Sequence, residues 1–166
     1  MNSKYKVLVA DDSVEDQQIT QFVLRDDPHF QISTCVSNGD QVIAYFKGWY
    51  AFADRARYPL PDILLLDMDM PYRDGFEVLR WLKSHPQDNL ITVMFTSSDL
   101  EEHVAKASSL GANGYIVKPG TVRELQSVPG RLLGIVNAVR HAEEGASPLF
   151  RFESLEATDT GLGSFL

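Results

Sequence analysis

Five side chains that could act together in one reaction follow directly after short apolar runs that are typical of buried strands. They are Asp11 and Asp12 after Tyr5–Ala10, Asp67 after Ile63–Leu66, Thr96 after Leu90–Phe95 and Lys118 after Gly114–Val117. If these runs are neighbouring parallel strands, their carboxyl ends bring the side chains to one edge of a sheet. Three adjacent carboxylates repel one another unless one takes up a proton or a cation lies between them. A hard divalent ion such as Mg²⁺, which prefers oxygen ligands, removes that conflict.

An acid beside Mg²⁺ and a lysine is a chemically complete site for accepting a phosphoryl group. The Asp67 carboxylate would attack phosphorus, while Mg²⁺ and the Lys118 ammonium would neutralise charge on the equatorial oxygens. The Thr96 hydroxyl could donate a hydrogen bond to one of these oxygens. We therefore expect Asp67, Lys118 and Thr96 to be the catalytic residues and the aspartates to hold the metal.

The segments between the apolar runs have the periodicity of helices, so strands and helices alternate along the chain. Helices are expected over Val14–Arg25, Gln41–Lys47, Gly75–Ser84, Asp99–Leu110 and Thr121 to about Arg140, and a further strand over Phe30–Val36. The first helix has an amphipathic pattern made by Val14, Ile19, Phe22 and Val23. Five βα units in this order predict an α/β fold with a doubly wound, five-stranded parallel sheet.

Length and charge exclude several classes of protein. The 166 residues, 44% of them hydrophobic, are enough for one domain with a core of its own. With 15 basic and 23 acidic residues the chain has a net charge of −8, which argues against nucleic-acid binding and favours a cation or a basic partner surface. A single cysteine, Cys35, excludes a disulfide framework and zinc sites built from several cysteines. The apolar runs fall short of the roughly 18 residues that cross a bilayer, and no secretion signal is recognisable. We therefore expect a cytoplasmic protein without a membrane partner.

At these residues the sequence closely resembles the receiver domain of two-component response regulators. The matching motifs are Asp11-Asp12, the run Asp67-Met68-Asp69-Met70-Pro71-Tyr72-Arg73-Asp74-Gly75, Thr96, Tyr115 and Lys118-Pro119. The D-x-x-M-P-x-x-D-G pattern is specific, and the resemblance covers roughly residues 4–126. It implies a flavodoxin-like (βα)5 receiver fold and a phosphorelay switch. The implied phosphoryl donor is a sensor histidine kinase or a histidine phosphotransfer protein.

The resemblance also implies a role for each matching residue. Asp67 would be the phosphoacceptor; Asp12 and Asp67 would bind Mg²⁺ directly, Asp11 would act through water, and the Asp69 backbone carbonyl would be a further ligand. Thr96 and Tyr115 would form a switch pair, Lys118 would bind phosphate, and the Lys118–Pro119 bond would be cis. If Thr96 moves toward a phosphoryl group, space opens for Tyr115 to turn inward. The protein would catalyse its own phosphorylation and dephosphorylation at Asp67, with no separate enzymatic turnover.

Two segments depart from the family pattern. The link over residues 47–61 is long and aromatic, with Trp49, Tyr50, Phe52 and Tyr58. It predicts either an extended second helix that packs its own loop or a docking surface. The insertion is similar to single-domain regulators paired with phytochrome-type kinases. The pair Pro129-Gly130 predicts either that the last helix ends near Ser127 and restarts with Pro129 in its first turn, or that it kinks.

The C-terminal segment over residues 145–166, after a receiver domain over 1–144, mixes small polar residues with large apolar ones. It is expected either to dock, on this subunit or on a neighbour, or to be disordered. No output domain is visible, so we expect the protein to act by binding, and a homodimer is the expected assembly.

Two other functions remain as alternatives. Asp67-Met68-Asp69 also resembles the first motif of haloacid-dehalogenase-type phosphatases, in which the second Asp is a general acid. Pro71 and the early position of Asp11-Asp12 argue against that reading. A phosphate-independent pseudo-receiver is the third class, but such modules usually lose the acids or the lysine, and this chain keeps them.

Overall fold

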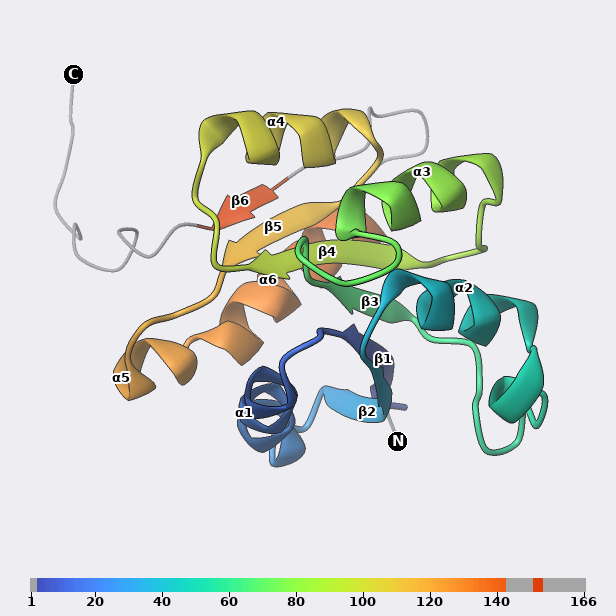
Figure 1. The fold of residues 1–166 in the computed structure, drawn as a ribbon. Coiled ribbons are helices and arrows are strands. Elements are labelled where there is room, and N and C mark those ends of the chain that lie inside the picture. Colours follow the sequence, from blue (N-terminus) through green and yellow to red (C-terminus); the bar gives the residue numbers. More distant parts are fainter. Residues whose placement is uncertain (1–2, 143–150, 154–166) are drawn as a thin grey trace, which may run out of the picture.

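The computed structural model describes residues 3–142 and 151–153, the last three by their backbone alone. Parallel strands form one sheet in the order β2-β1-β3-β4-β5-β6 (Figure 1). The strands are β1 (Tyr5–Ala10), β2 (Phe30–Val36), β3 (Ile63–Leu66), β4 (Ile91–Thr96), β5 (Gly114–Val117) and β6 (Arg151–Glu153). The helices are α1 (Val14–Arg25), α2 (Gly39–Lys47), the 3₁₀ helix η1 (Tyr50–Phe52), α3 (Gly75–Ser84), α4 (Glu101–Ser109), α5 (Val122–Leu125) and α6 (Val128–Arg140).

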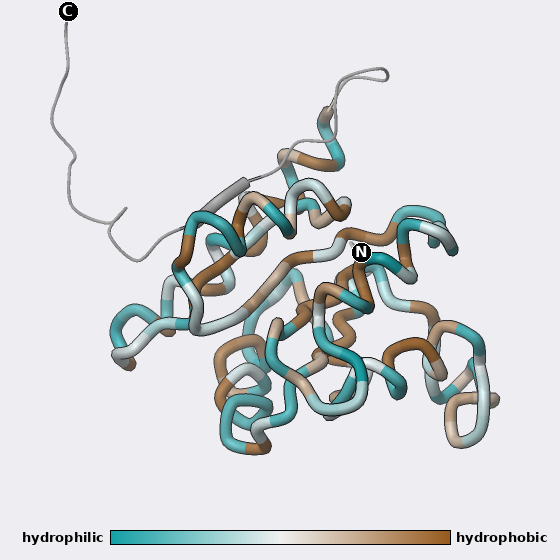
Figure 2. The backbone as a smooth tube through the Cα atoms, turned by 45° about the horizontal axis from the view of Figure 1, so that its top comes forward, coloured by the Kyte–Doolittle hydropathy of each residue, from teal (hydrophilic) through white to brown (hydrophobic). Residues whose placement is uncertain are grey.

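Helices cover both faces of the sheet, as the alternation of elements predicts. On β3, Leu64 and Leu66 belong to the apolar core beneath α2, α3 and α4, whereas Ile63 and Leu65 belong to the core beneath α1 and α6. Hydrophobic residues are accordingly concentrated in the central strands (Figure 2). The doubly wound parallel sheet is therefore confirmed. A sixth strand, β6, adds to the five predicted ones and pairs with β5.

Local sequence signals fix where the helices begin. The Ser13 hydroxyl accepts a hydrogen bond from the Asp16 N–H at the start of α1. Asp74 forms a capping box with Glu77 at the start of α3, so that two otherwise unpaired N–H groups are satisfied. The predicted bounds of α1 and α3 agree with the structure. Among the described residues, no helix is both long enough and apolar enough to span a bilayer.

The apolar pattern of α1 does not predict its buried face. Thr20 and Leu24 are the buried residues of the helix, whereas Ile19 and Phe22 are exposed by 41% and 67%. Both exposed side chains line an apolar groove that continues onto Leu125 of α5. Helix α1 therefore has one apolar surface against the sheet and a second one that faces this groove.

The last predicted helix is two helices. Helix α5 ends at Leu125, and α6 starts at Val128 with Pro129 in its first turn. A proline is tolerated there because the first N–H groups of a helix have no partner within the helix. The first of the two predicted alternatives is thus confirmed, and no kinked helix forms.

The aromatic link packs mainly on itself without an extended second helix. Helix α2 ends at Lys47, where Gly48 adopts a left-handed conformation with φ +65°. The buried Tyr45 lies with its ring centroid 5.1 Å from that of Phe52 and 6.1 Å from that of Tyr58. The Tyr45 hydroxyl also donates a hydrogen bond of 2.8 Å to the Pro59 carbonyl. Tyr45 therefore ties the end of α2 to the far side of the link.

Replacing Tyr45 by Phe should lower the free energy of unfolding by about 1 kcal/mol, because the Pro59 carbonyl loses its donor. The matched control is Tyr50→Phe, since Tyr50 is 86% exposed, and its effect should stay within about 0.5 kcal/mol. Urea unfolding followed by far-ultraviolet circular dichroism measures both. Equal stabilities of the two variants would show that the Tyr45 hydroxyl does not stabilise the link.

Candidate functional site

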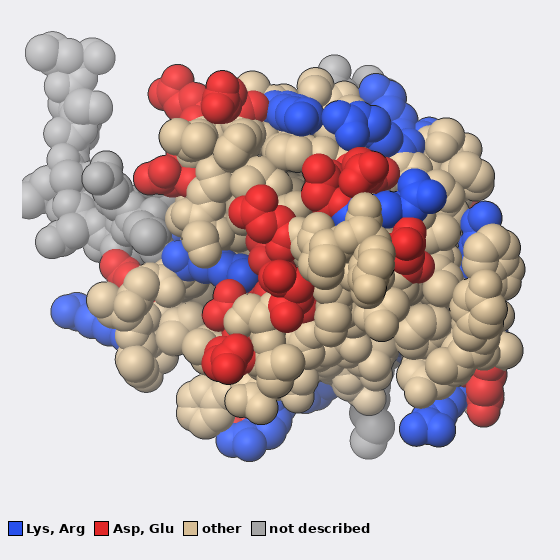
Figure 3. Space-filling model, in the orientation of Figure 1, with Lys and Arg blue, Asp and Glu red and all other residues tan. Residues whose placement is uncertain are grey.

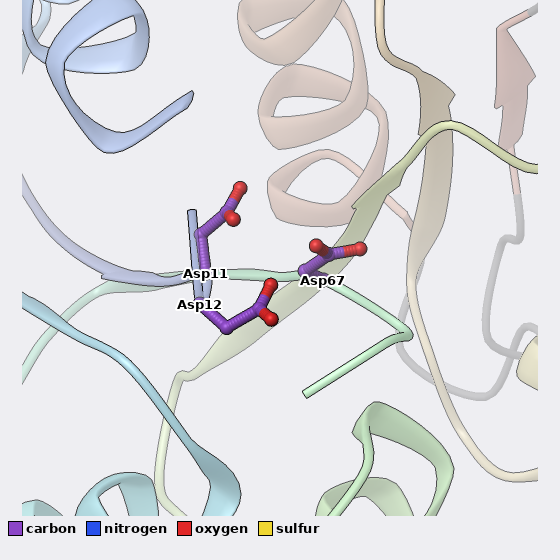
Figure 4. A group of neighbouring side chains, drawn as sticks. All are labelled: Asp11, Asp12 and Asp67. Atoms are coloured by element: carbon purple, nitrogen blue, oxygen red, sulfur yellow. The ribbon is translucent and has the colours of Figure 1, made fainter. Parts of the chain in front are cut away.

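The neighbouring strands β1 and β3 deliver the predicted aspartates to one place. Ala10 and Leu66, the last residues of the two strands, lie opposite each other in the ladder. Beyond them the Asp67 N–H donates a hydrogen bond of 2.9 Å to the Ala10 carbonyl. One carboxylate oxygen each from Asp11, Asp12 and Asp67 lies within 4.8 Å of the others (Figure 4). The structure thus brings together the three carboxylates that the sequence predicts.

The three carboxylates differ in their access to water. Asp11 and Asp67 are buried, whereas Asp12 is exposed. Burial raises the pKa of Asp11, and this effect exceeds the opposing hydrogen bonds from Lys118 and from the Ser13 N–H. Acidic side chains also gather over the ends of β1, β3 and β4 on the face seen in Figure 3. This crowding of oxygen donors, open to solvent at Asp12, fits a hard divalent cation.

Lys118 closes the site from the end of β5. Its backbone N–H donates a hydrogen bond of 2.8 Å to the Thr96 carbonyl, which continues the ladder past the strand. Its ammonium nitrogen lies 2.7 Å from Asp11 Oδ2, 2.7 Å from Asp16 Oδ2 and 3.1 Å from Asp67 Oδ2. Burial alone would lower the pKa of Lys118, but these carboxylates raise it above its ordinary value. The lysine is therefore a fixed cation beside the predicted phosphoacceptor.

Asp16 is the site residue that the sequence did not single out. Acidic residues are common in the first turn of a helix because the helix dipole favours them there. The residue type and position of Asp16 therefore do not indicate a role at the site. The Lys118–Pro119 bond is trans, so the cis bond that the resemblance implied is wrong. The trans form is favoured by about 0.5–1 kcal/mol for an X–Pro bond, and Lys118 reaches the carboxylates with it.

The loop after β3 is held close to the phosphoacceptor. Met68 and Met70 are buried, while Asp69 between them is exposed. The Gly75 N–H donates a hydrogen bond of 2.8 Å to the Met68 carbonyl, and a Cβ on Gly75 would lie 2.3 Å from the Asp67 carbonyl oxygen. Only glycine permits this approach of α3 to the end of β3. The Asp69 side chain is not part of the carboxylate cluster, and its backbone carbonyl remains a predicted ligand.

The predicted switch residues lie on neighbouring strands and on the same face of the sheet. Met94 pairs with Tyr115, and Thr96 pairs with Val117, so Thr96 and Tyr115 are diagonal neighbours. Both are buried, and the Tyr115 hydroxyl donates a hydrogen bond of 2.8 Å to the Ser98 carbonyl. Burial raises the pKa of Tyr115. We expected Tyr115 to turn inward only on phosphorylation. In this structure its side chain is already buried, and the Ser98 carbonyl accepts the hydrogen bond of its hydroxyl there.

The known proteins that this chain is similar to include two response regulators of known structure and part of a longer protein. The response regulator RPA3017 in red light signalling of R. palustris is 34% identical; the match covers 77% of this chain and 90% of that one, with a TM-score of 0.69. The phosphorylated cyanobacterial phytochrome response regulator RcpA is 25% identical, with coverages of 82% and 94% and a TM-score of 0.69. A protein-glutamate methylesterase/protein-glutamine glutaminase of Halalkalibacterium halodurans is 31% identical over 119 residues, which are 72% of this chain and 32% of the relative. The chain therefore spans about a third of the length of that relative.

A family match agrees with these similarities. Residues 7–128 match the response regulator receiver domain, and this range includes all the strand-end residues described above. The resemblance drawn from the motifs, including the similarity to phytochrome-linked regulators, is confirmed. The parallel strands, the acidic site at their ends and this family match together show that the chain belongs to the response regulator receiver family.

Proposed function

We propose that this chain is a phosphorylation switch of a two-component relay and that Asp67 accepts the phosphoryl group. The observation that carries the proposal is the position of Asp67, 3.1 Å from the Lys118 ammonium and within reach of the Asp11 and Asp12 carboxylates. A nucleophile, a fixed cation and a site for a metal ion thus meet at one point. The donor is a phosphohistidine of a sensor kinase or of a phosphotransfer protein.

The residues have distinct tasks in the transfer. An Asp67 oxygen forms the new bond to phosphorus while the bond from phosphorus to the donor nitrogen breaks, and the imidazole keeps that electron pair. The Lys118 ammonium neutralises charge on the phosphoryl oxygens, and the Thr96 hydroxyl donates a hydrogen bond to one of them. Attack by water on phosphorus later returns Asp67 to its free carboxylate.

The same site supports a divalent cation as part of the proposal. Receivers of this family generally bind Mg²⁺ or Mn²⁺ at an acidic pocket. Here Asp12 and Asp67 would hold Mg²⁺ directly, Asp11 would act through water, and the Asp69 carbonyl would be a further ligand. When bound, Mg²⁺ supplies positive charge for the phosphoryl oxygens.

Two alternative functions receive less support from the site. A haloacid-dehalogenase-type phosphatase would need Asp69 as a general acid, yet the carboxylate cluster consists of Asp11, Asp12 and Asp67. A phosphate-independent module would not need a lysine held beside the acids, yet Lys118 contacts two members of that cluster. Both observations favour the phosphoryl acceptor.

The output of the switch is proposed to be a change in protein contacts. Residues 1–144 would form the switch domain and residues 145–166 its tail, with a homodimer as the leading assembly and the kinase as a transient partner. Ile19, Phe22 and Leu125 line an exposed apolar groove, and Trp49 of the aromatic link is half-exposed. Either surface can bury apolar area against a partner.

A cytoplasmic location belongs to the same proposal, because donor and acceptor must share a compartment.

Acetyl phosphate with Mg²⁺ should add one phosphoryl group to the wild-type protein, and Asp67→Asn should abolish the addition because an amide is a poor nucleophile. Asp88→Asn is the matched control, since it removes an exposed carboxylate that lies outside the cluster, and it should leave the addition unchanged. Intact-mass spectrometry measures both. Phosphorylation of Asp67→Asn at the wild-type rate would contradict the assignment of the phosphoacceptor.

Asp12→Ala should weaken Mg²⁺ binding by at least about tenfold, because a direct oxygen ligand is lost. Its fold should persist, since Asp12 is exposed and its removal relieves repulsion from Asp11 and Asp67. Calorimetric titration with Mg²⁺ gives the affinity, and thermal unfolding gives the stability. An unchanged affinity would exclude Asp12 from the set of ligands.

Beryllofluoride, which mimics the aspartyl-phosphoryl group, should change the sedimentation coefficient by shifting the protein between monomer and dimer. A ligand shifts such an equilibrium only if it binds one state more tightly, which Thr96 and Lys118 would provide. Trp49→Ala and truncation at Gly145 then locate the contact. If neither sedimentation nor affinity for a purified cognate kinase responds to beryllofluoride, the switch hypothesis fails.

A further inference from the structure

Asp16 is a fourth carboxylate at the site, and it contacts the lysine. Its Oδ2 lies 2.7 Å from the Lys118 ammonium nitrogen, as close as Asp11 and closer than Asp67 at 3.1 Å. The group of carboxylates that could hold a metal consists of Asp11, Asp12 and Asp67, without Asp16. Any role of Asp16 at the site must therefore act through its contact with Lys118.

The start of α1 fixes the position of Asp16. The Asp16 N–H donates a hydrogen bond of 3.2 Å to the Ser13 hydroxyl, and the Thr20 hydroxyl donates one of 2.9 Å to the Asp16 carbonyl. The Ser13 N–H donates in turn to Asp11 Oδ1 at 3.0 Å. One residue, Ser13, thus sets the spacing between two of the carboxylates that hold Lys118. The first turn of a helix also stabilises a carboxylate through the helix dipole.

An ammonium group has three N–H donors, and the Lys118 ammonium has three carboxylate neighbours. We propose that Asp16 is a positioning residue for phosphoryl transfer: it holds Lys118 from the side of α1, so that the ammonium, which donates a hydrogen bond of 3.1 Å to Asp67, keeps its place beside this carboxylate. This inference rests on the proposed function, in which Asp67 is the nucleophile and Asp11 serves the cation. Once Asp11 serves the cation, Asp16 is the carboxylate that still orients the lysine.

Loss of Asp16 removes this restraint in two ways. A lysine released from α1 can shift toward Asp11 and Asp67 and tighten its existing hydrogen bond to the carboxylate that must attack. It can also turn toward solvent, since Asp16 lies at the partly exposed end of the contact, with 37% of its side chain accessible against 2% for Asp11. In both cases the phosphoryl oxygens lose a correctly placed cation, and misplacement of about 1 Å at such a site costs up to roughly 100-fold in rate.

The test compares phosphorylation rates by acetyl phosphate at saturating Mg²⁺. Asp16→Ala should react at least about tenfold more slowly than the wild type, and Asp16→Asn, which keeps an oxygen acceptor, should fall between the two. Glu15→Gln is the matched control, because it removes one charge from the same turn, and it should stay within about twofold. A wild-type rate for Asp16→Ala would overturn the inference.

A double-mutant cycle separates positioning from a general effect on the fold. In a Lys118→Ala background, Asp16→Ala should cause no further loss of rate beyond about twofold, because its partner is gone. Mg²⁺ affinity, measured by calorimetry, should also stay within about twofold of the wild type in Asp16→Ala. Additive losses of rate, or a tenfold loss of Mg²⁺ affinity, would show that Asp16 does not act through Lys118.

The mobility of the Lys118 ammonium is a readout that requires no phosphorylation. The ¹⁵N order parameter of this group should fall in Asp16→Ala and stay unchanged in Glu15→Gln. If the wild type takes up no phosphoryl group, the proposed function fails, and the order parameter still decides whether Asp16 orients the lysine. An order parameter that is equal in wild type and Asp16→Ala would overturn the positioning role by itself.

Discussion

Mutual repulsion among carboxylates is the constraint on which the rest of this structure depends. Asp11, Asp12 and Asp67 place an oxygen each within 4.8 Å of the others, and two of them are buried. In a medium of low dielectric, like charges at this distance cost several kcal/mol unless cations lie among them. Lys118 supplies one such cation, and a second one can reach the cluster from solvent at the exposed Asp12. A site that is destabilised without positive charge is well suited to bind a metal ion and an incoming phosphoryl group.

The parallel sheet is what makes this arrangement possible. All the strand ends point the same way, and β1 and β3 are neighbours although α1, β2 and α2 separate them in sequence. The carboxylate cluster therefore lies where the order of the strands reverses, which is where doubly wound sheets generally bind ligands. Gly75 lets α3 approach the Asp67 carbonyl, while Ser13 caps α1 on the other side. The backbone thus holds the acids in place before any ligand arrives.

Much of this could be predicted because each strand is short, apolar and followed at once by a polar group. The bounds of β1 and β3 and the gathering of their aspartates follow from that pattern. Asp16 could not be found in this way, since an acid at a helix start satisfies the helix whether or not a lysine lies nearby. The spacing of apolar residues in α1 wrongly predicted that Phe22 is buried against the sheet. Phe22 instead lines the exposed groove beside α5, on a face of the helix that no strand covers. The inward position of Tyr115 depends on tertiary contacts that the sequence does not reveal, whereas the trans bond at Pro119 is the form that an X–Pro bond ordinarily favours and only the family resemblance implied cis.

The pairing of β6 with β5 determines which side of the sheet remains available for main-chain association. Residues 151–153 occupy the edge of β5, and Phe152 stands opposite Tyr115 in the ladder. Of the strands that the structure describes, β2 is then the edge strand opposite β6, and its pairing with β1 is irregular, with a shift of register between Val7 and Leu8. Irregular edges are poor templates for another strand. Addition of a further strand at β2 is thus disfavoured, and any strand exchange at β5 would first have to release residues 151–153 of the chain itself.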